Sequence, residues 1–382
     1  MDRIAALPCM NLLFYIHSLA NGGAEKVLAW LASELAAAGH SVTLVTNTTP
    51  EQDAYPIHAA VTRRSTYTPD AARGVTDSVV NTWRRTRRLR AVASESRPDV
   101  LITFMPVANT IGGLVARLSG LAHIIGERVH PPYAQYRFGQ KWLMHLAYRR
   151  SSAVTVLSEA SAAWIRAHTQ APFVTVIPNA VRLPLADLQP RMNPTDFADA
   201  SQRVIICVGR LVDQKQPEQV LEAFARARAT HSYWVLWMIG DGPSRDALLE
   251  QARALDIEDA VRFIPRVGNL QVFYERADIY ISASAFEGFP NALMEAMACG
   301  CAPISYDCPT GPAEVIASRD WGCLVSNGDV AELSAGLAAL MAPGSDIAHI
   351  QQHARQVTRR YDPSDVLESW LGLLERTSSG SL

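Results

Sequence analysis

The sequence predicts an α/β protein with two doubly wound, Rossmann-like domains. Three observations support this fold class: a length of 382 residues, an alternation of short apolar segments with amphipathic helical segments, and one interruption of that alternation near the middle. A chain of this length exceeds what one hydrophobic core usually supports. Strands that alternate with helices are typical of parallel sheets covered by helices. We therefore expect two such domains joined by a linker.

The first series of strands and helices begins with an apolar segment, 10–19, which is followed by a helix that ends near Gly39 and by a strand at 41–47. Together these segments form a βαβ unit. The pattern breaks after 179, and the prolines and aspartates of 182–202 predict a linker. Further strands of this first domain are expected at 99–106, 122–127 and 153–158.

A second series follows the linker and forms the second domain, 203–362. Ligands of doubly wound sheets bind at the carboxyl ends of the strands, so the residues that follow each strand are the candidates for function. Its strands are expected at 203–210, 234–242, 261–265, 277–284 and 301–307.

The most informative stretch covers residues 284–301, SAFEGFPNALMEAMACGC. Gly288 can adopt backbone angles closed to other residues, and Pro290 has the fixed φ and the missing N–H that suit a first helical turn. We therefore expect a helix that begins near Pro290. Apart from Glu295, its side chains are mostly small or apolar, which predicts that the helix is buried.

Two carboxylates, Glu287 and Glu295, lie eight positions apart around that helix start. A buried Glu295 would need hydrogen-bond donors, and the hydroxyls of a sugar diol would supply them. The free N–H groups around 288–292 form a site for an anionic phosphate. An alternative stays open, in which Glu287 only complements the helix dipole and Glu295 lies on a solvated stripe.

Two further loops carry residues suited to a phosphorylated ligand. Gly22 and Gly23 follow the first strand and permit close backbone approach at a helix start, although a plain tight turn is the alternative. Arg210 and Lys215 follow the first strand of the second domain. A planar guanidinium and a mobile ammonium suit a diphosphate, although a surface salt bridge would place the same residues there.

Two other loops carry weaker signals. Gly240 to Pro243 form a turn that allows close approach of a ligand, and the segment 263–269, which contains Arg266, could present backbone groups to a nucleobase.

Composition favours a globular protein without a membrane span. Hydrophobic residues make up 48% and charged residues 19%, and no apolar run is long enough to cross a bilayer. The N-terminal run 4–20 is interrupted by Pro8, Asn11 and His17, which indicates a loop and a buried strand, not a signal peptide, and predicts a cytoplasmic location. The six cysteines form no CxxC pair, so we expect packed, reduced thiols and no zinc site.

The net charge of −2 hides an asymmetry. Residues 1–180 hold 18 Lys and Arg against 11 Asp and Glu, so the rest of the chain carries −9. The positive charge is concentrated at 83–90 and 128–150, where arginine and lysine are mixed with Trp and Tyr. This mixture suits an anionic membrane surface. Nucleic acid is the rival partner, which we do not expect, and a merely solvated helix face is an equal alternative.

The order of the segments GGAE, VGRLVDQK, IGDGP and ADIYISASAFEGFPNALMEAMACGCAPIS resembles the retaining glycosyltransferases of family 4. The resemblance covers most of the chain and implies the GT-B fold, two Rossmann-like domains that face a cleft. LITFMPVANT, IIGERVHPPY and YDCPTGPAEVI are similar to segments of bacterial enzymes that build exopolysaccharide or lipid-linked oligosaccharide. The resemblance to the family implies that residues 1–181 bind the acceptor, that residues 203–362 bind a nucleotide sugar, and that a helix in 363–382 returns to the first domain.

Carried over by position, the resemblance implies that Arg210 and Lys215 hold the donor diphosphate and stabilise it as the leaving group. Glu287 would contact the transferred hexose, and Glu295 would bind the ribose hydroxyls. Because Gly22 and Gly23 would approach the donor from the other domain, catalysis would require closure of the cleft. No metal ion and no cofactor are expected. The implied donor-binding set is Gly22, Gly23, Arg210, Lys215, Arg266, Glu287, Gly288, Phe289, Asn291, Ala292 and Glu295.

The chain departs from the family pattern at two places. Many relatives carry a histidine after the strand that here ends in IIGERVHPPY, where this chain has Glu127 and Arg128. We expect Glu127 to be catalytic, and Arg128 and His130 to lie on the acceptor side, although two prolines restrict the backbone after His130. Pro290 stands where many relatives carry glycine, which should be tolerated because its nitrogen need not donate a hydrogen bond.

These expectations describe a metal-independent, retaining hexosyltransferase. It would use a nucleotide diphosphate sugar, most readily a UDP-sugar, and a lipid-linked or polysaccharide acceptor hydroxyl, at the inner face of a membrane. Two alternatives stay open: a nucleotide-sugar-binding scaffold without transfer activity, and a GT-B epimerase of nucleotide sugars. A nicotinamide oxidoreductase is disfavoured because the glycine fingerprint of a dinucleotide fold is missing.

Overall fold

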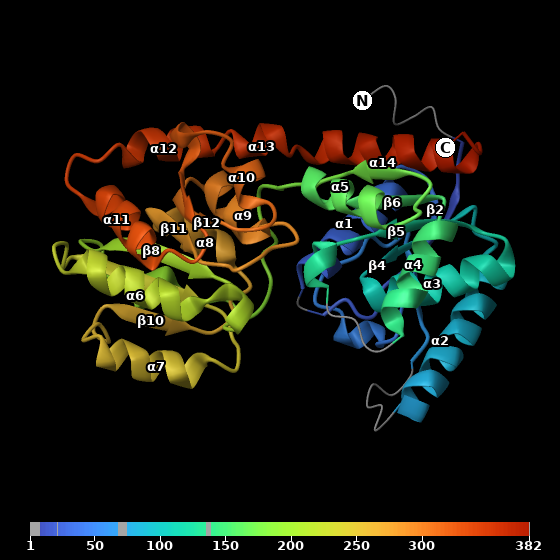
Figure 1. The fold of residues 1–382 in the computed structure, drawn as a ribbon, viewed down its shortest axis with the longest axis horizontal. Helices are drawn as coiled ribbons and strands as arrows, with labels where there is room; N and C mark the ends of the chain where they lie inside the picture. Colours follow the sequence, from blue (N-terminus) through green and yellow to red (C-terminus); the bar gives the residue numbers. More distant parts are fainter. Residues whose placement is uncertain (1–7, 21, 68–74, 135–138, 382) are drawn as a thin grey trace. The chain divides into compact units, whose positions relative to one another are not determined.

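The computed structural model describes residues 8–20, 22–67, 75–134 and 139–381. The chain divides into two compact units: unit 1 comprises Met1–Asn179 with Ser364–Leu382, and unit 2 comprises Ala180–Pro363. Each unit contains one parallel β-sheet with helices packed against it (Figure 1). The prediction of two Rossmann-like α/β domains is therefore confirmed.

Unit 1 has a seven-stranded sheet in the order β3-β2-β1-β4-β5-β6-β7. All pairs are parallel. The central strands are buried along almost their whole length, as expected for a sheet covered on both faces. The strands are β1 Asn11–Tyr15, β2 Ser41–Thr46, β3 Thr62–Ser65, β4 Val100–Phe104, β5 Ala122–Gly126, β6 Ala153–Val156 and β7 Val174–Val176.

The helices of unit 1 include one from the far end of the chain. The C-terminal helix α14 (Pro363–Ser378) buries Trp370, whose ring centroid lies 6.0 Å from that of Phe104 on β4. Helices α2, α3 and α4 lie side by side (Figure 1). The other helices of the unit are α1 Gly23–Ala37, α2 Val75–Ser96, α3 Pro106–Ser119, α4 Gln140–Arg150, α5 Glu159–His168 and the short η1 Pro50–Gln52 and η2 Pro131–Tyr133.

Unit 2 has a six-stranded parallel sheet in the order β10-β9-β8-β11-β12-β13. Its strands are β8 Arg203–Val208, β9 Trp234–Ile239, β10 Val261–Ile264, β11 Ile279–Ser282, β12 Ala302–Asp307 and β13 Cys323–Ser326. Its helices are η3 Pro194–Asp196, η4 Asp213–Lys215, α6 Pro217–Arg228, α7 Arg245–Ala254, α8 Leu270–Arg276, α9 Asn291–Cys299, α10 Pro312–Val315, η5 Arg319–Trp321, α11 Val330–Met341, α12 Ile347–Ala354 and α13 Val357–Arg360.

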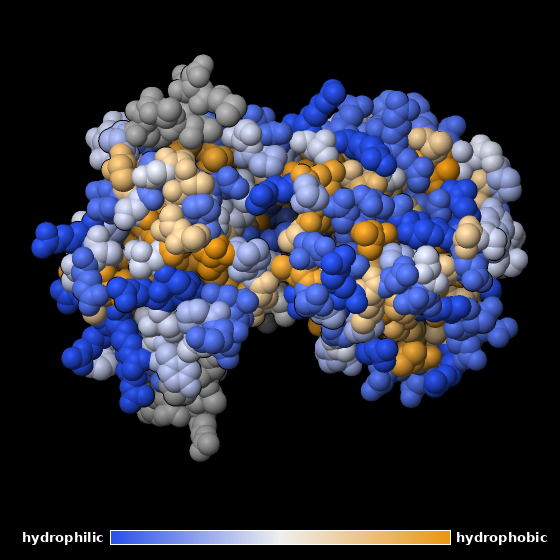
Figure 2. Space-filling view, turned by 180° about the vertical axis from the view of Figure 1, so that it is seen from behind, coloured by the Kyte–Doolittle hydropathy of each residue, from blue (hydrophilic) through white to orange (hydrophobic). Residues whose placement is uncertain are grey.

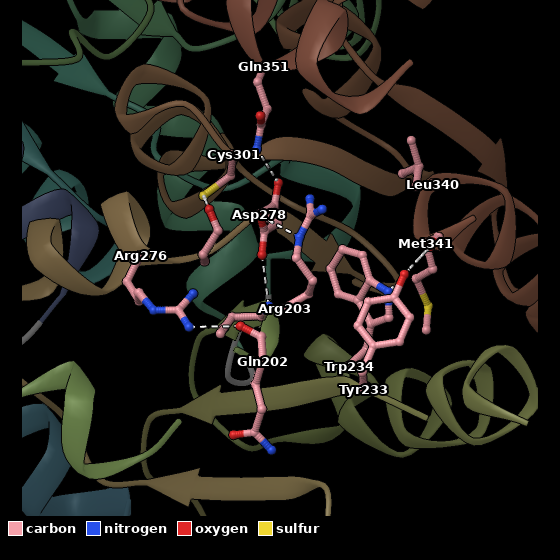
Figure 3. A network of polar contacts seen from close by, with 12 residues as sticks. Gln202, Arg203, Tyr233, Trp234, Arg276, Asp278, Cys301, Leu340, Met341 and Gln351 are labelled. Carbon is pink, nitrogen blue, oxygen red and sulfur yellow. Dashed lines mark hydrogen bonds and ion pairs between the residues drawn. The ribbon is translucent and has the colours of Figure 1, made fainter. Parts of the chain in front are cut away.

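A polar network at the amino ends of β8 and β11 fixes the alignment of these two central strands (Figure 3). The Asp278 carboxylate accepts a hydrogen bond from the Val204 N–H (2.9 Å) and pairs with Arg203 Nε at 2.9 Å. The Arg203 guanidinium also lies 4.8 Å from the centroid of the Trp234 ring, and Gln351 on α12 donates to the Asp278 carbonyl at 3.0 Å. This network holds the strands in register, so the loops at their opposite ends occupy fixed positions.

The strands predicted from apolar segments are present, and α9 begins at Asn291, directly after Pro290, as the sequence predicts. Three strands were not predicted: β3, β7 and β13. All three are edge strands of three or four residues. An edge strand has a sheet neighbour on one side only, so it needs no continuous apolar run and gives a weak sequence signal.

The segment 182–202, expected as a linker, is bound to unit 2 by hydrogen bonds. The Leu185 N–H donates to Gln271 Oε1 at 2.7 Å, and the Met192 N–H donates to Asn269 Oδ1 at 3.1 Å. A further contact is so close that a Cβ on Gly268 would lie 2.1 Å from the Leu188 carbonyl oxygen. This segment therefore adds structure to unit 2 near α8.

All six cysteines are free thiols, and five are at least partly buried. Cys9 is exposed, so the prediction of packed thiols is wrong for this residue. Within the described part of the chain, no helix is both long and apolar enough to span a bilayer. The face of the molecule in Figure 2 is largely hydrophilic, with separate hydrophobic patches.

Candidate functional site

The topology of unit 2 places two of the predicted loops side by side. In the order β10-β9-β8-β11-β12-β13, the chain leaves β8 toward one edge of the sheet and returns to β11 on the other side. This reversal is the topological switch point, where doubly wound sheets bind ligands at the carboxyl ends of the strands. The loop that carries Arg210 and Lys215 follows β8, and the loop that carries Glu287 follows β11.

Hydrogen bonds join these two loops directly. The Gln214 side chain donates to the Phe286 carbonyl at 3.0 Å, and the Ala285 N–H donates to the Gln214 carbonyl at 2.9 Å. The loop after β9 supports them from the other side, because a Cβ on Gly240 would lie 2.0 Å from the Gly209 carbonyl oxygen. Gly240 also has φ +142°, so glycine is required there for two reasons.

Lys215 and Glu287 form an ion pair in this structure. The distance from Lys215 Nζ to Glu287 Oε1 is 2.5 Å, and the two side chains are 27% and 10% exposed. The backbone of Glu287 is held by the loop after β12: its N–H donates to the Pro309 carbonyl at 3.0 Å, and its carbonyl accepts from Thr310 Oγ1 at 3.0 Å. The backbone of Glu287 is therefore held in place, while the Lys215 side chain stays partly exposed to solvent.

The start of α9 is packed against the same β12 loop. Gly311 has φ +104°, and a Cβ there would lie 2.6 Å from Pro290 Cδ. Asn291 and Ala292, in the first turn of α9, are partly exposed, and so is Glu295 one turn later. Because the first N–H groups of a helix lack partners within it, this end of α9 can bind an anion.

Phe289, which was expected among the donor-binding residues, has its side chain turned into the protein. It is 6% exposed, and its ring centroid lies 5.5 Å from that of Tyr361. Any donor contact at this position would therefore come from the backbone. Its neighbour Gly288 contributes its carbonyl to a 3.5 Å hydrogen bond from Thr310 Oγ1.

Two arginines lie near this site without an ion-pair partner among the described residues. Arg210 follows β8 and is exposed. Arg266 follows β10 and is partly exposed, and its N–H donates to Asp241 Oδ2 at 3.2 Å. The loops at this end of the unit 2 sheet thus carry Lys215 in an ion pair, and Arg210 and Arg266 without one among the described residues. The described residues also contain no cluster of three His, Cys, Asp or Glu that could hold a metal ion.

Sequence reasoning missed the buried groups around the ion pair. Burial raises the pKa of Cys207 on β8 to about 12, and the nearby Lys215 opposes this shift. Burial also raises the pKa of Cys308 to about 12 and that of Tyr280 well above its usual range, with further contributions from the Glu287 carboxylate. These residues stay neutral and provide a low-dielectric surrounding. Cys207 and Tyr280 lie in apolar strands and Cys308 directly follows β12, so their local sequences offered no signal of a polar neighbour.

The glycines of unit 1 precede and start a helix. Gly22 is the N-cap of α1 and Gly23 its first residue, whereas Asn21 lies outside the described residues. A Cβ on Gly22 would lie 2.0 Å from the Glu25 carboxylate. The contacted atoms are the far end of a flexible side chain, so this contact alone does not require glycine, and close approach of a ligand stays a prediction.

Glu127 follows β5 and points into the interior of unit 1. It is 1% exposed, and Asn109 on α3 donates to Glu127 Oε1 at 2.9 Å. Burial raises the pKa of Glu127 to about 7, against the opposing effects of Tyr148, Asn109 and Arg128. The network continues inward, because Thr103 Oγ1 bridges Asn109 Oδ1 and His123 Nε2. Direct contact between Glu127 and a substrate would require this network to open.

Arg128 and His130 are also buried. The Arg128 guanidinium lies 3.8 Å from the Phe104 ring centroid and 5.7 Å from that of Trp370, and burial lowers its pKa to about 9. His130 Nδ1 lies 2.8 Å from Ser161 Oγ, and burial lowers the pKa of its imidazole. The three residues share the carboxyl end of β5, but each is held by a different partner.

The arrangement in unit 2 suits an anionic ligand that also carries hydroxyl groups. Two kinds of cation and a helix start can receive a diphosphate, and the carboxylates of Glu287 and Glu295 can accept hydrogen bonds from sugar hydroxyls. The switch-point location agrees with a nucleotide ligand.

Comparisons with known proteins give the family. A model of Glycosyltransferase Family 4 matches residues 21–183, and a model of Glycosyl transferases group 1 matches residues 193–357. An N-acetylgalactosaminyltransferase of Campylobacter jejuni, whose name specifies a diphospho-undecaprenol-linked acceptor, is 25% identical over 378 residues, 96% of this chain and 98% of that protein. The amylovoran biosynthesis glycosyltransferase AmsD of Erwinia amylovora is 24% identical over 95% of this chain and 99% of its own length.

The fold has well-matched solved structures. HepE of Anabaena, solved with UDP and glucose, superposes with a TM-score of 0.78 at 20% identity and covers 96% of this chain and 99% of its own. The two family models leave few residues of the chain unmatched, and both sheets have the Rossmann-like order. The chain therefore belongs to the glycosyltransferases of these two models and has the GT-B fold.

Proposed function

We propose that this glycosyltransferase moves a hexose, with retention of anomeric configuration, from a UDP-sugar to a hydroxyl of a lipid-linked or polysaccharide acceptor. The observation that carries the proposal is the Lys215–Glu287 ion pair at the switch point of unit 2. The UDP bound to HepE supports the choice of nucleotide, and the names of the Campylobacter and Erwinia relatives support the class of acceptor.

The donor would be held by groups that match its parts. Lysine has three N–H donors, of which the pair with Glu287 uses one, so two remain for phosphate oxygens. Arg210 and the first amides of α9 would bind the other oxygens of the diphosphate. Glu287 would receive a hexose hydroxyl and Glu295 the ribose hydroxyls. In this scheme the cations neutralise the leaving diphosphate, which is the task that a metal ion performs in other transferases.

Retention would follow from displacement on one face of the sugar. The bond from the anomeric carbon to the diphosphate oxygen breaks while the acceptor oxygen bonds to the same carbon, and the acceptor proton passes to the departing diphosphate. No covalent enzyme intermediate is assigned. Glu127, which is expected to be catalytic, would contribute from its buried position by orienting the Asn109 and Arg128 side chains beside it.

A donor screen tests this proposal. UDP-sugars and GDP-sugars are added to the purified protein and the melting temperature is measured, because a ligand that binds only the folded state raises apparent stability. We expect stabilisation by UDP-sugars and, with a polyprenyl-linked acceptor, a glycosylated product in the α configuration when the donor is α-linked. Binding without any turnover would support the scaffold, and conversion of the donor sugar without an acceptor would support the epimerase.

We also propose that the protein associates with an anionic membrane surface through unit 1, at the inner face of the membrane. Trp83 on α2 and Trp142 on α4 are 60% and 67% exposed. The exposed cations Arg84 and Lys141 are their sequence neighbours, and the exposed Arg87 guanidinium lies 5.7 Å from the Trp83 ring centroid. Aromatic and basic side chains together favour binding to anionic headgroups. Co-sedimentation with phosphatidylglycerol vesicles should fall when Trp83 and Trp142 are both replaced by serine, and unchanged sedimentation would contradict this surface.

A further inference from the structure

Unit 1 contains a pocket of its own. It has a volume of about 270 Å³ and is formed by η2, α4 and α5. Both η2 and α5 follow strand ends, since η2 comes after β5 and α5 comes after β6. The pocket therefore borders the carboxyl edge of the unit 1 sheet, the edge at which doubly wound sheets bind ligands.

The wall of the pocket is apolar and aromatic. Met144 and Tyr148 on α4 are 1% and 2% exposed, and Trp164 on α5 and the two prolines of η2 line the same pocket. Trp164 is held by a stacked His168 ring, with centroids 4.6 Å apart. Fixed rings and a flexible methionine form a surface that favours an apolar chain.

The polar side chains of the pocket are Lys141, His145 and Tyr148. Lys141 is an exposed cation, whereas burial and the nearby Lys141 lower the pKa of His145, so its imidazole is a neutral N–H donor. Lys141 and His145 lie one helical turn apart on α4, so both side chains lie on the same face. None of the described side chains that line the pocket is a carboxylate or an amide. A neutral sugar needs acceptors for its hydroxyls, whereas an anion needs the donors that are present here. The lining therefore matches a ligand with an apolar chain and an anionic head.

One buried carboxylate interacts with a residue of the pocket wall. Glu127 interacts with Tyr148, and burial raises its pKa to about 7, so a large fraction is uncharged near neutral pH. The positive charge of Lys141 is exposed, and no ion pair involving it is found among the described residues. An anionic head would therefore meet Lys141 without strong competition.

From this juxtaposition we propose that the pocket binds the phosphate-bearing start of an isoprenoid chain, and that it selects a polyprenyl diphosphate-linked acceptor. The anionic head contacts Lys141 and His145, and the first apolar units of the chain lie against Trp164, Met144 and the prolines. A volume of about 270 Å³ holds only part of such a ligand, because whole-ligand pockets begin at about 300 Å³. The inference rests on the proposed transferase function, narrows the acceptor to one linked through a polyprenyl diphosphate, and assigns the residues that bind it.

The test is calorimetric titration of the full chain with farnesyl diphosphate below its micellar concentration. Farnesol supplies the chain without the head, and inorganic diphosphate supplies the head without the chain. We expect farnesyl diphosphate to bind at least tenfold more tightly than either. Lys141→Glu and Trp164→Ala should each weaken its binding at least tenfold, whereas Arg117→Glu, an exposed charge reversal on α3 outside the pocket, should leave it unchanged.

Equal affinity in all three variants, or equally tight binding of inorganic diphosphate, would overturn the proposal. Tighter binding of dihexanoyl phosphatidylglycerol than of farnesyl diphosphate would assign the pocket to a membrane lipid and would overturn the acceptor assignment. UDP titrations of the same preparations separate this inference from the function on which it rests. Retained UDP binding with no farnesyl diphosphate binding refutes only the pocket, whereas failure of UDP to bind refutes the proposed donor site.

Discussion

Replacement of Lys215 by alanine is the perturbation with the largest expected effect. The ammonium group lies 2.5 Å from Glu287 Oε1 and the Lys215 side chain is 27% exposed, so the charge is only partly screened by water. A unit charge about 4 Å from a phosphate oxygen contributes about 4 kcal/mol at an effective dielectric constant of about 20. Since about 1.4 kcal/mol corresponds to a tenfold change in rate, and partial exposure lowers the value, turnover should fall by about 10²–10³-fold.

The assay is product formation at saturating UDP-sugar, with the melting temperature measured in parallel. The parallel measurement is needed because Lys215→Ala leaves Glu287, which is 10% exposed, without its cationic partner. Arg253→Ala is the matched control, since Arg253 is a 67% exposed cation of unit 2 whose partner, Glu258, lies 3.7 Å away. Turnover in a folded Lys215→Ala variant that equals that of the control would refute the electrostatic role of Lys215.

Three further predictions concern stability and are measured by urea unfolding. Burial raises the folded-state pKa of Glu127 from 4.5 to about 7, so the folded state binds the proton more tightly and the wild type loses stability as pH rises between these values. Glu127→Gln lacks this titration, so its stability relative to wild type should increase from pH 5 to pH 8. A difference that does not change with pH would contradict this. Gly311→Ala should destabilise by roughly 2 kcal/mol more than Gly344→Ala, because both glycines have positive φ but only a Cβ on Gly311 meets another atom; equal costs would exclude the contact with Pro290. Trp370→Ala should cost about 3–5 kcal/mol, since the ring is 1% exposed against Phe104, and a cost below about 1 kcal/mol would show that α14 is not anchored there.

The strands and helices could be predicted where burial imposes a pattern. Strands such as β4 and β9 are buried on both faces, so their sequences are nearly continuous apolar runs. The edge strands β3, β7 and β13 lack that constraint, and the sequence TRRS of β3 contains no apolar residue. The sequence showed that the alternation of strands and helices is interrupted at 182–202. It did not show that this segment forms hydrogen bonds with Asn269 and Gln271 at the start of α8, because these residues lie about 80 positions further along the chain.

The sequence indicated which residues form the candidate site, but not which of them contact one another. Arg210, Lys215, Glu287 and Glu295 were identified by residue type and by their position after strands. The ion pair between Lys215 and Glu287 joins residues that are 72 positions apart, so only the strand order brings them together.

The position of Glu127 shows a different limit of sequence reasoning. A polar residue after a strand is ordinarily exposed, yet Glu127 is covered by residues of α3 and α4. Its burial depends on packing between helices, which the local sequence does not reveal. The same holds for Arg128, which is enclosed in part by Trp370, a residue of the C-terminal helix.

A crystal structure of the protein soaked with UDP-glucose would examine the diphosphate position most directly. We predict that the phosphate oxygens lie about 3 Å from Lys215 Nζ and from the first backbone amides of α9, with the ribose at Glu295. Density for the nucleotide in another part of unit 2, with the Lys215–Glu287 pair unaltered and the start of α9 unoccupied, would contradict the account.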